Sequence, residues 1–141
     1  EQLSTPKDIS FEWDVPALMM VRCDGEQIYR ILGNLVRNAR QALEASGKPG
    51  KIMISGQEAS DGWRLTVSDS GPGLPPKARE NLFTAFEGGV RKGGTGLGLA
   101  IAAELARGHG GTLTLTRSDE HGTEFQLFLP KENALFEQAA Q

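Results

Sequence analysis

The chain has 141 residues, of which 38% are hydrophobic and 23% charged, and its net charge is -3. These values fit one globular domain with its own core, and the slight acidity argues against a broad basic face for nucleic acid. A single cysteine, Cys23, excludes an internal disulfide and favours a reducing, cytoplasmic setting. No apolar run is long enough to span a bilayer, so we expect no direct membrane contact. Because the chain begins with Glu rather than Met, we expect it to be part of a longer protein.

The first part of the chain predicts two strands followed by one long helix. Apolar and polar residues alternate over 8–15, which predicts a half-buried strand. Residues 18–23 predict a second strand. Asp24 suits a helix N-cap, and apolar residues then recur at i, i+3, i+4 spacing until Gly47. We therefore expect an amphipathic helix with one apolar stripe.

The rest of the chain predicts two pairs of strands separated by a long glycine-rich stretch, over 70–95. Such a stretch is uncommon in a compact domain unless it forms a lid or binding loop. The mixture of helices and strands lacks a regular βαβα alternation and predicts an α+β sandwich. The expected elements are strands 51–58 and 63–69, a short helix around 76–83, a helix over 96–107, strands 112–117 and 123–129, and a loose or helical tail.

Three polar residues share one side of the first helix. At about 100° per residue, Asn34, Asn38 and Gln41 fall on one flank of the apolar stripe, whereas Arg37 and Arg40 point elsewhere, toward solvent. Amide oxygens on such a flank can help to hold Mg²⁺, which takes few protein ligands beside water and phosphate oxygens. The alternative is that the asparagines are only polar edge residues of an amphipathic helix.

Asp69 occupies an unexpected position. The apolar residues of 63–67 alternate with polar neighbours, and Asp69 is the next residue of the buried parity. An aspartate before Ser-Gly can simply form an Asx turn. If buried, it needs hydrogen-bond donors, and the amino group of a ligand such as adenine would supply one. Gly71 and Gly73 would let the backbone approach a flat ring, and Thr123 has the matching inward parity in the last strand.

The segment "GGTGLGLA" (93–100) opens the second helix. Glycines at a helix N-terminus let backbone N–H groups approach a phosphate. The segment is neither a P-loop, because no Gly-Lys-Ser/Thr follows, nor a Rossmann fingerprint. Arg91 and Lys92 either reach phosphates or are simply solvated. We interpret the other candidates as structural: Glu104, His109 and His121.

In order, these segments resemble the motifs of the catalytic and ATP-binding domain of sensor histidine kinases. That domain belongs to the ATPase superfamily shared with gyrase, mismatch-repair and heat-shock chaperone ATPases. The resemblance covers about residues 8–130, and "NARQAL" is similar to the nitrogen-regulation kinases. The matching segments are "NLVRNARQAL" (N box), "DSGPGLP" and "GGTGLGLA" (glycine boxes), "LFTAF" (phenylalanine box) and "GTEFQLFLP" (last glycine box).

The resemblance implies a two-layer sandwich with a mixed, mostly antiparallel sheet, helices on one face and a long ATP lid. It implies that Asn38, assisted by Asn34, ligates Mg²⁺, and that Asp69 accepts a hydrogen bond from adenine with support from Thr123 through water. Phe83 and Phe86 would anchor the lid or dock on partner helices. The other implied ATP-binding residues are Gln41, Gly71, Gly73, Leu74, Arg91, Lys92, Gly94, Thr95, Gly96, Leu97 and Gly98.

Two features depart from the family pattern. Many members carry Lys or Arg three residues after the metal-binding Asn, where this chain has Gln41. Arg91 or Lys92 would then meet the phosphate charge, or Arg40 if the helix turns further than assumed. The phosphoacceptor box (His, then an acidic residue and shortly afterwards Pro) is absent from the sequence. We therefore expect the histidine to lie on a separate domain upstream.

The resemblance implies a protein-histidine kinase that binds Mg·ATP and phosphorylates a histidine on its own dimerisation domain. A downstream response regulator, a homodimeric full-length protein and a cytoplasmic location, or the cytosolic part of a membrane-anchored sensor, are also expected. We expect residues 1–7 to be a linker, 8–130 the catalytic domain and 131–141 a tail. The alternatives are an ATP-driven clamp or serine-directed kinase of the same superfamily, and an adapter that has lost ATP binding.

Overall fold

The computed structural model describes residues 9–17, 25–80, 82–83 and 98–131. The expected strand over 18–23, most of the expected lid and the tail beyond residue 131 lie outside the described residues. The described elements, in chain order, are β1 (Ile9–Asp14), α2 (Gly25–Ser46), β2 (Gly50–Glu58), β3 (Gly62–Asp69), α3 (Pro76–Glu80), α4 (Gly98–Gly108), β4 (Thr112–Asp119) and β5 (Gly122–Pro130).

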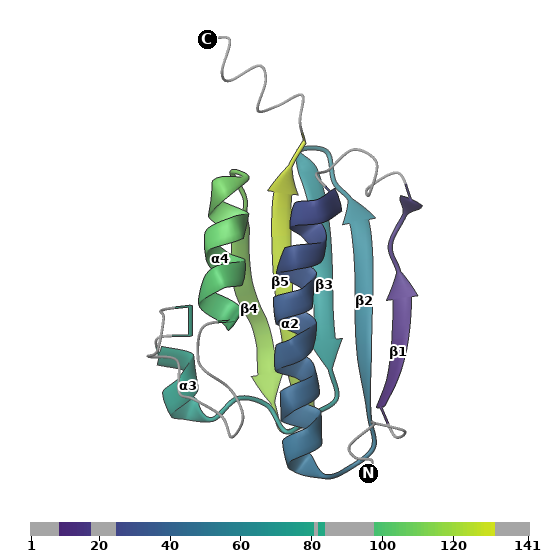
Figure 1. The fold of residues 1–141 in the computed structure, drawn as a ribbon, viewed down its shortest axis with the longest axis vertical. Helices are drawn as coiled ribbons and strands as arrows, with labels where there is room; N and C mark the ends of the chain where they lie inside the picture. The colour runs from purple at the N-terminus through teal and green to yellow at the C-terminus, as the bar shows by residue number, and fades with distance from the viewer. Residues whose placement is uncertain (1–8, 18–24, 81, 84–97, 132–141) are drawn as a thin grey trace.

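The strands form one mixed sheet in the order β1-β2-β3-β5-β4. β1 pairs with β2 in parallel, and the other three pairings are antiparallel. Figure 1 shows α2 and α4 side by side on one face of this sheet. The predicted α+β sandwich, with a mostly antiparallel sheet and helices on one face, is confirmed.

The core lies between the two helices and the central strands. Ile31 and Leu35 of α2 are almost fully buried, as the apolar stripe predicts. On β3 the buried positions alternate with more exposed ones, and Leu65 pairs with Leu127 of β5 so that both side chains point toward the helices. The period-two pattern carries Asp69 inward as well, because it has the parity of Leu65.

The prediction that the first strand is half buried is wrong. Phe11 and Trp13 pair with Ile52 and Ile54 of β2 and share their face of the sheet. Ile52 and Ile54 are buried, but Phe11 and Trp13 are each 50% exposed. The exposure follows from the place of β1 in the sheet and not from its alternating sequence. β1 is the edge strand, next to β2 and two strands away from the centre of the sheet. Alternation therefore predicted the correct face but not whether a helix covers it.

A β-bulge interrupts the pairing of β4 with β5. Leu115 pairs with Phe125, but Arg117 rather than Thr116 pairs with Glu124, so that Ser118 comes to lie opposite Thr123. An extra residue shifts every later side chain of a strand to the other face. The bulge therefore turns Arg117 away from the helices and turns Ser118 toward them.

Several predicted boundaries differ in detail. Helix α3 ends at Glu80, before the predicted 83, and the strands β4 and β5 together leave Glu120 and His121 as the turn. None of the helices described here is long and apolar enough to cross a bilayer.

Candidate functional site

The inward-facing ends of β3 and β5 bring Asp69 and Thr123 together. These residues pair directly across the two strands and are 6% and 1% exposed. They are the buried polar residues of the described core. Asp69 Oδ1 accepts a hydrogen bond from the Gly71 backbone N–H at 2.8 Å. Asp69 thus forms the Asx turn that the sequence allows and is also buried, so the two interpretations are compatible.

Two glycines, Gly71 and Gly73, lie in the loop that follows Asp69. A Cβ on Gly71 would lie 3.0 Å from Asp69 Oδ1 and 3.7 Å from Ala42 Cβ, so a side chain there would fill the space between α2 and the carboxylate. Gly73 has a φ of +84°, and a Cβ would lie 2.2 Å from the Asp119 carbonyl oxygen. Both the backbone conformation and the close contact require glycine at position 73.

Ser118 connects the hairpin to the glycine-rich loop. Its Oγ accepts a hydrogen bond from the Leu74 N–H at 2.7 Å and lies 3.4 Å from Thr123 Oγ1. Leu74 itself is buried in the hydrophobic core. Sequence reasoning missed Ser118, because strict alternation from Leu115 would have turned Arg117 inward instead.

The hairpin turn beyond Ser118 is held by Asp119. The backbone N–H of His121 donates to Asp119 Oδ1 at 2.8 Å, and Arg117 donates to the same oxygen. The hydrogen bond from His121 is the main cause that lowers the pKa of the Asp119 carboxyl. His121 is a turn residue, as predicted.

The asparagine flank of α2 faces the start of α4. Asn34 is half buried; its Nδ2 donates to the Arg30 carbonyl oxygen at 3.0 Å, and its Oδ1 accepts from Arg37 Nη1 at 3.2 Å. A Cβ on Gly98 would lie 3.5 Å from Asn34 Oδ1. Asn38 and Gln41 are also half buried, as their place beside the apolar stripe predicts. The N box and the second glycine box therefore meet in space.

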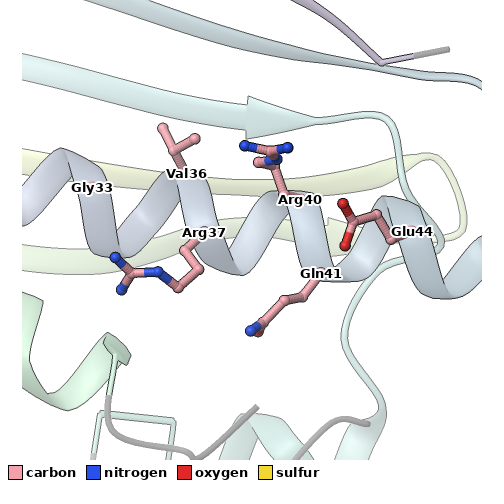
Figure 2. Close-up of a pocket in the computed structure, with 6 residues that line it drawn as sticks. All are labelled: Gly33, Val36, Arg37, Arg40, Gln41 and Glu44. Carbon is pink, nitrogen blue, oxygen red and sulfur yellow. The ribbon is translucent and has the colours of Figure 1, made fainter. Parts of the chain in front are cut away.

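The outward side of α2 carries a groove of about 380 Å³. Figure 2 shows Arg37 and Gln41 extending from one side of the helix, and Val36 and Arg40 from the opposite side. Arg40 is half buried rather than simply solvated and does not share the side of Gln41. The groove is lined by Gly33, Val36, Arg37, Arg40, Gln41 and Glu44.

The asparagine oxygens are the hard donors that this flank offers to a cation. Within the described ranges, no cluster of three or more His, Cys, Asp or Glu side chains could hold a metal ion. Amide oxygens beside a substrate's phosphates fit Mg²⁺, which keeps most of its ligands as water and phosphate oxygens. This donor set suits a metal that arrives with a nucleotide better than one held permanently by the protein.

The remaining predicted site residues are only partly described. Phe83 packs against the core, with its ring centroid 6.1 Å from that of Phe125 at an interplanar angle of 64°. His109 caps the end of α4 through Nδ1, which lies 2.9 Å from the Leu105 carbonyl oxygen, and Glu104 forms an exposed ion pair with Arg107. The roles of His109 and Glu104 are structural, as predicted. The residues that lie outside the described ranges are Phe86, Arg91, Lys92, Gly94, Thr95, Gly96 and Leu97.

Comparison with known proteins gives this arrangement a family. Residues 23–133 match the histidine kinase-, DNA gyrase B- and HSP90-like ATPases, and the chain belongs to this family. The predicted resemblance to the catalytic and ATP-binding domain of sensor histidine kinases is confirmed.

The relatives include proteins of the predicted subgroup. The sensory histidine kinase/phosphatase NtrB of Salmonella typhimurium is 39% identical over 123 residues, which cover 82% of this chain and 35% of NtrB. The sensor protein KdpD of Escherichia coli is 34% identical over 94% of this chain and 14% of its own length. The chain thus spans about a third or less of these relatives.

Solved structures share the fold over most of the chain. The catalytic domain of the histidine kinase ThkA is 34% identical, with a TM-score of 0.70, over 88% of this chain and 81% of that one. Full-length ShkA, solved in complex with AMPPNP, is 32% identical with a TM-score of 0.72, over 87% of this chain and 26% of its own.

Proposed function

We propose that this chain binds Mg·ATP and is the catalytic part of a protein-histidine kinase in a two-component phosphorelay. The observation that carries the proposal is the buried carboxylate of Asp69, with Gly71 beside it and Thr123 opposite. In this proposal the adenine amino group donates a hydrogen bond to the Asp69 carboxylate, whose Oδ1 also accepts the Gly71 N–H. The AMPPNP complex of ShkA, a relative at 32% identity, supports the same type of ligand here.

The phosphates would lie between the asparagine flank of α2 and the N-terminus of α4. Backbone N–H groups at a helix start favour anions, and Gly98 leaves space against Asn34. Asn38, assisted by Asn34, would hold Mg²⁺, which neutralises phosphate charge when bound. The residues assigned to the nucleotide outside the described ranges, from Arg91 to Leu97, remain part of this proposal, as does the lid with Phe83 and Phe86.

In the proposed reaction, a histidine ring nitrogen on a separate dimerisation domain attacks the γ-phosphorus. A P–N bond forms, the bond to the β–γ bridging oxygen breaks, ADP leaves, and the imidazole gives up one proton to a base outside this chain. Positioning and charge neutralisation would supply most of the catalysis. We further propose a homodimeric full-length protein, a response regulator that receives the phosphoryl group, a cytoplasmic location, and a catalytic domain over 8–130 with flanking linker and tail.

The nucleotide assignment is tested by titration calorimetry with Mg·ATP. We expect Asp69→Asn to weaken binding about ten-fold or more, because the new amide NH₂ would face the amino group of adenine in place of an acceptor. Asp61→Asn is the matched control, since Asp61 is exposed in the β2–β3 turn. Equal affinities for the two variants would refute the adenine role of Asp69. No binding by the wild-type chain would favour the adapter alternative.

The reaction itself is tested by adding the dimerisation domain of the same full-length protein. Acid-labile, base-stable phosphorylation of that domain is expected, with one ADP released for each phosphohistidine formed. ATP hydrolysis without phosphohistidine would instead favour an ATP-driven clamp.

A further inference from the structure

The asparagine flank of α2, which we propose faces the phosphates, carries the neutral residue Gln41. Gln41 lies on the asparagine flank, three residues after Asn38. A nucleoside triphosphate brings several negative charges, and helix N-termini supply only about half a unit of compensating charge. A cationic side chain close to Asn34 and Gly98 would therefore strengthen phosphate binding, and Gln41 cannot provide it.

Arg37 is placed to supply this charge. It precedes Asn38 by one residue, so the helical wheel points it outward, but its guanidinium turns back and donates to Asn34 Oδ1 at 3.2 Å. The Arg30 carbonyl oxygen holds the Asn34 amide nitrogen at 3.0 Å, which directs the amide oxygen toward Gly98. Through this contact the positive charge of Arg37 lies on the side of α2 that carries Gln41 (Figure 2).

Six other cations of the described ranges are engaged away from the asparagine flank. Four form ion pairs with carboxylates on the sheet, the hairpin or α4, one lies over the Phe128 ring, and one donates to the Leu74 carbonyl oxygen. These residues are Lys51, Arg107, Arg117, Lys131, Arg64 and Arg79. Arg40 lies on the same helix but extends from the opposite side.

We propose that Arg37 is a phosphate-binding cation of this site and supplies charge that Gln41 lacks. The proposal rests on the proposed nucleotide function. Without nucleotide, the Arg37 guanidinium donates to Asn34 Oδ1. When Mg·ATP binds, Arg37 donates to a phosphate oxygen instead. The Asn34 side-chain oxygen is then available to the metal. The exchange is favourable because a neutral amide oxygen is a weaker partner than a phosphate, to which arginine donates two parallel hydrogen bonds.

The exposure of Arg37 permits this movement. Arg37 is exposed, and its contact with Asn34 is a single hydrogen bond between residues three apart on one helix. Such a bond contributes little net stability, so its loss opposes the exchange only weakly. For the same reason, substitution of Arg37 should leave the fold and its unfolding midpoint unchanged, which makes binding measurements interpretable.

The experiment compares Arg37→Gln with Arg40→Gln, which removes the same charge from the other side of α2. Dissociation constants are measured by calorimetry for Mg·ATP, Mg·ADP and AMP. We expect Arg37→Gln to weaken Mg·ATP binding about ten-fold, corresponding to about 1.4 kcal/mol, to weaken Mg·ADP binding less, and to leave AMP binding unchanged. Arg40→Gln should change all three affinities less than two-fold, apart from a general charge effect that high salt removes.

A rescue variant separates a phosphate contact from a structural role. Adding Gln41→Lys to Arg37→Gln restores a cation on the same flank, and we expect it to recover most of the lost Mg·ATP affinity. The proposal is overturned if Arg37→Gln weakens AMP and Mg·ATP equally, if Arg40→Gln has the larger effect, or if Gln41→Lys rescues nothing. If the wild-type chain and every variant fail to bind any adenine nucleotide, the proposed function itself has failed.

Discussion

The hydroxyl oxygens of Ser118 and Thr123 lie 3.4 Å apart across the hairpin of β4 and β5. Ser118 also accepts the Leu74 N–H, so that a single side chain joins the end of the sheet to the loop that follows Asp69. This link holds the glycine-rich loop against the two buried polar residues. The position of the loop, and with it the width of the proposed adenine pocket, depends on a residue that no motif marks.

We therefore expect Ser118→Ala to destabilise this corner of the domain. The Leu74 N–H would lose its partner in a partly buried setting, which costs about 1 kcal/mol in the free energy of unfolding. A loop displaced by that loss should bind Mg·ATP several-fold more weakly. Urea denaturation and calorimetry measure the two effects, and Ser10→Ala, on the exposed edge strand, is the control. Indistinguishable behaviour of the two alanine variants would show that Ser118 does not support the site.

Gly98→Ala should separate folding from ligand binding. The new Cβ would lie 3.5 Å from Asn34 Oδ1, an ordinary contact, and alanine favours helix over glycine by up to about 1 kcal/mol. Thermal stability should thus be unchanged or slightly raised. The methyl group would, however, occupy the space between α4 and Asn34 proposed for phosphate, so Mg·ATP binding should weaken by about ten-fold or more. A variant that is stable and binds Mg·ATP normally would argue that the phosphates lie elsewhere.

The centre and the edge of the sheet should respond differently to truncation. Leu65→Ala removes a side chain that is 1% exposed, and we expect it to lower the free energy of unfolding by about 2–5 kcal/mol. Phe11→Ala removes a larger side chain that is 50% exposed, so we expect a loss of less than about 1.5 kcal/mol. Chemical denaturation measures both. A loss at Phe11 as large as that at Leu65 would mean that the edge strand is covered in solution.

Local periodicity predicted much of the fold and part of the site. The spacing of apolar residues in 28–43 predicted which face of α2 is buried, and hence that Asn34, Asn38 and Gln41 share a flank. The period of two in β3 and β5 predicted that Asp69 and Thr123 both point inward, and the structure pairs them directly. These inferences succeed because the repeat of a helix or strand is set by neighbouring residues in the chain.

Other features are not determined by the period of a single helix or strand. Phe11 has the correct parity for a core residue, but only the strand order decides that it stands at an uncovered edge. The bulge near Thr116 reverses the alternation of β4 and exchanges Arg117 for Ser118 at the site. The outward wheel position of Arg37 did not predict that its long side chain returns to Asn34.

The sequence by itself thus determined the family, the order of the elements and the inward direction of Asp69, because these depend on motifs and on repeats along the chain. The tertiary structure decided which strand lies at the edge, which hydroxyl supports the glycine loop, and which arginine reaches the asparagine flank. The first two outcomes depend on pairing between distant strands, and the third on the conformation of one long side chain within α2. The periodicity of a single element encodes none of these.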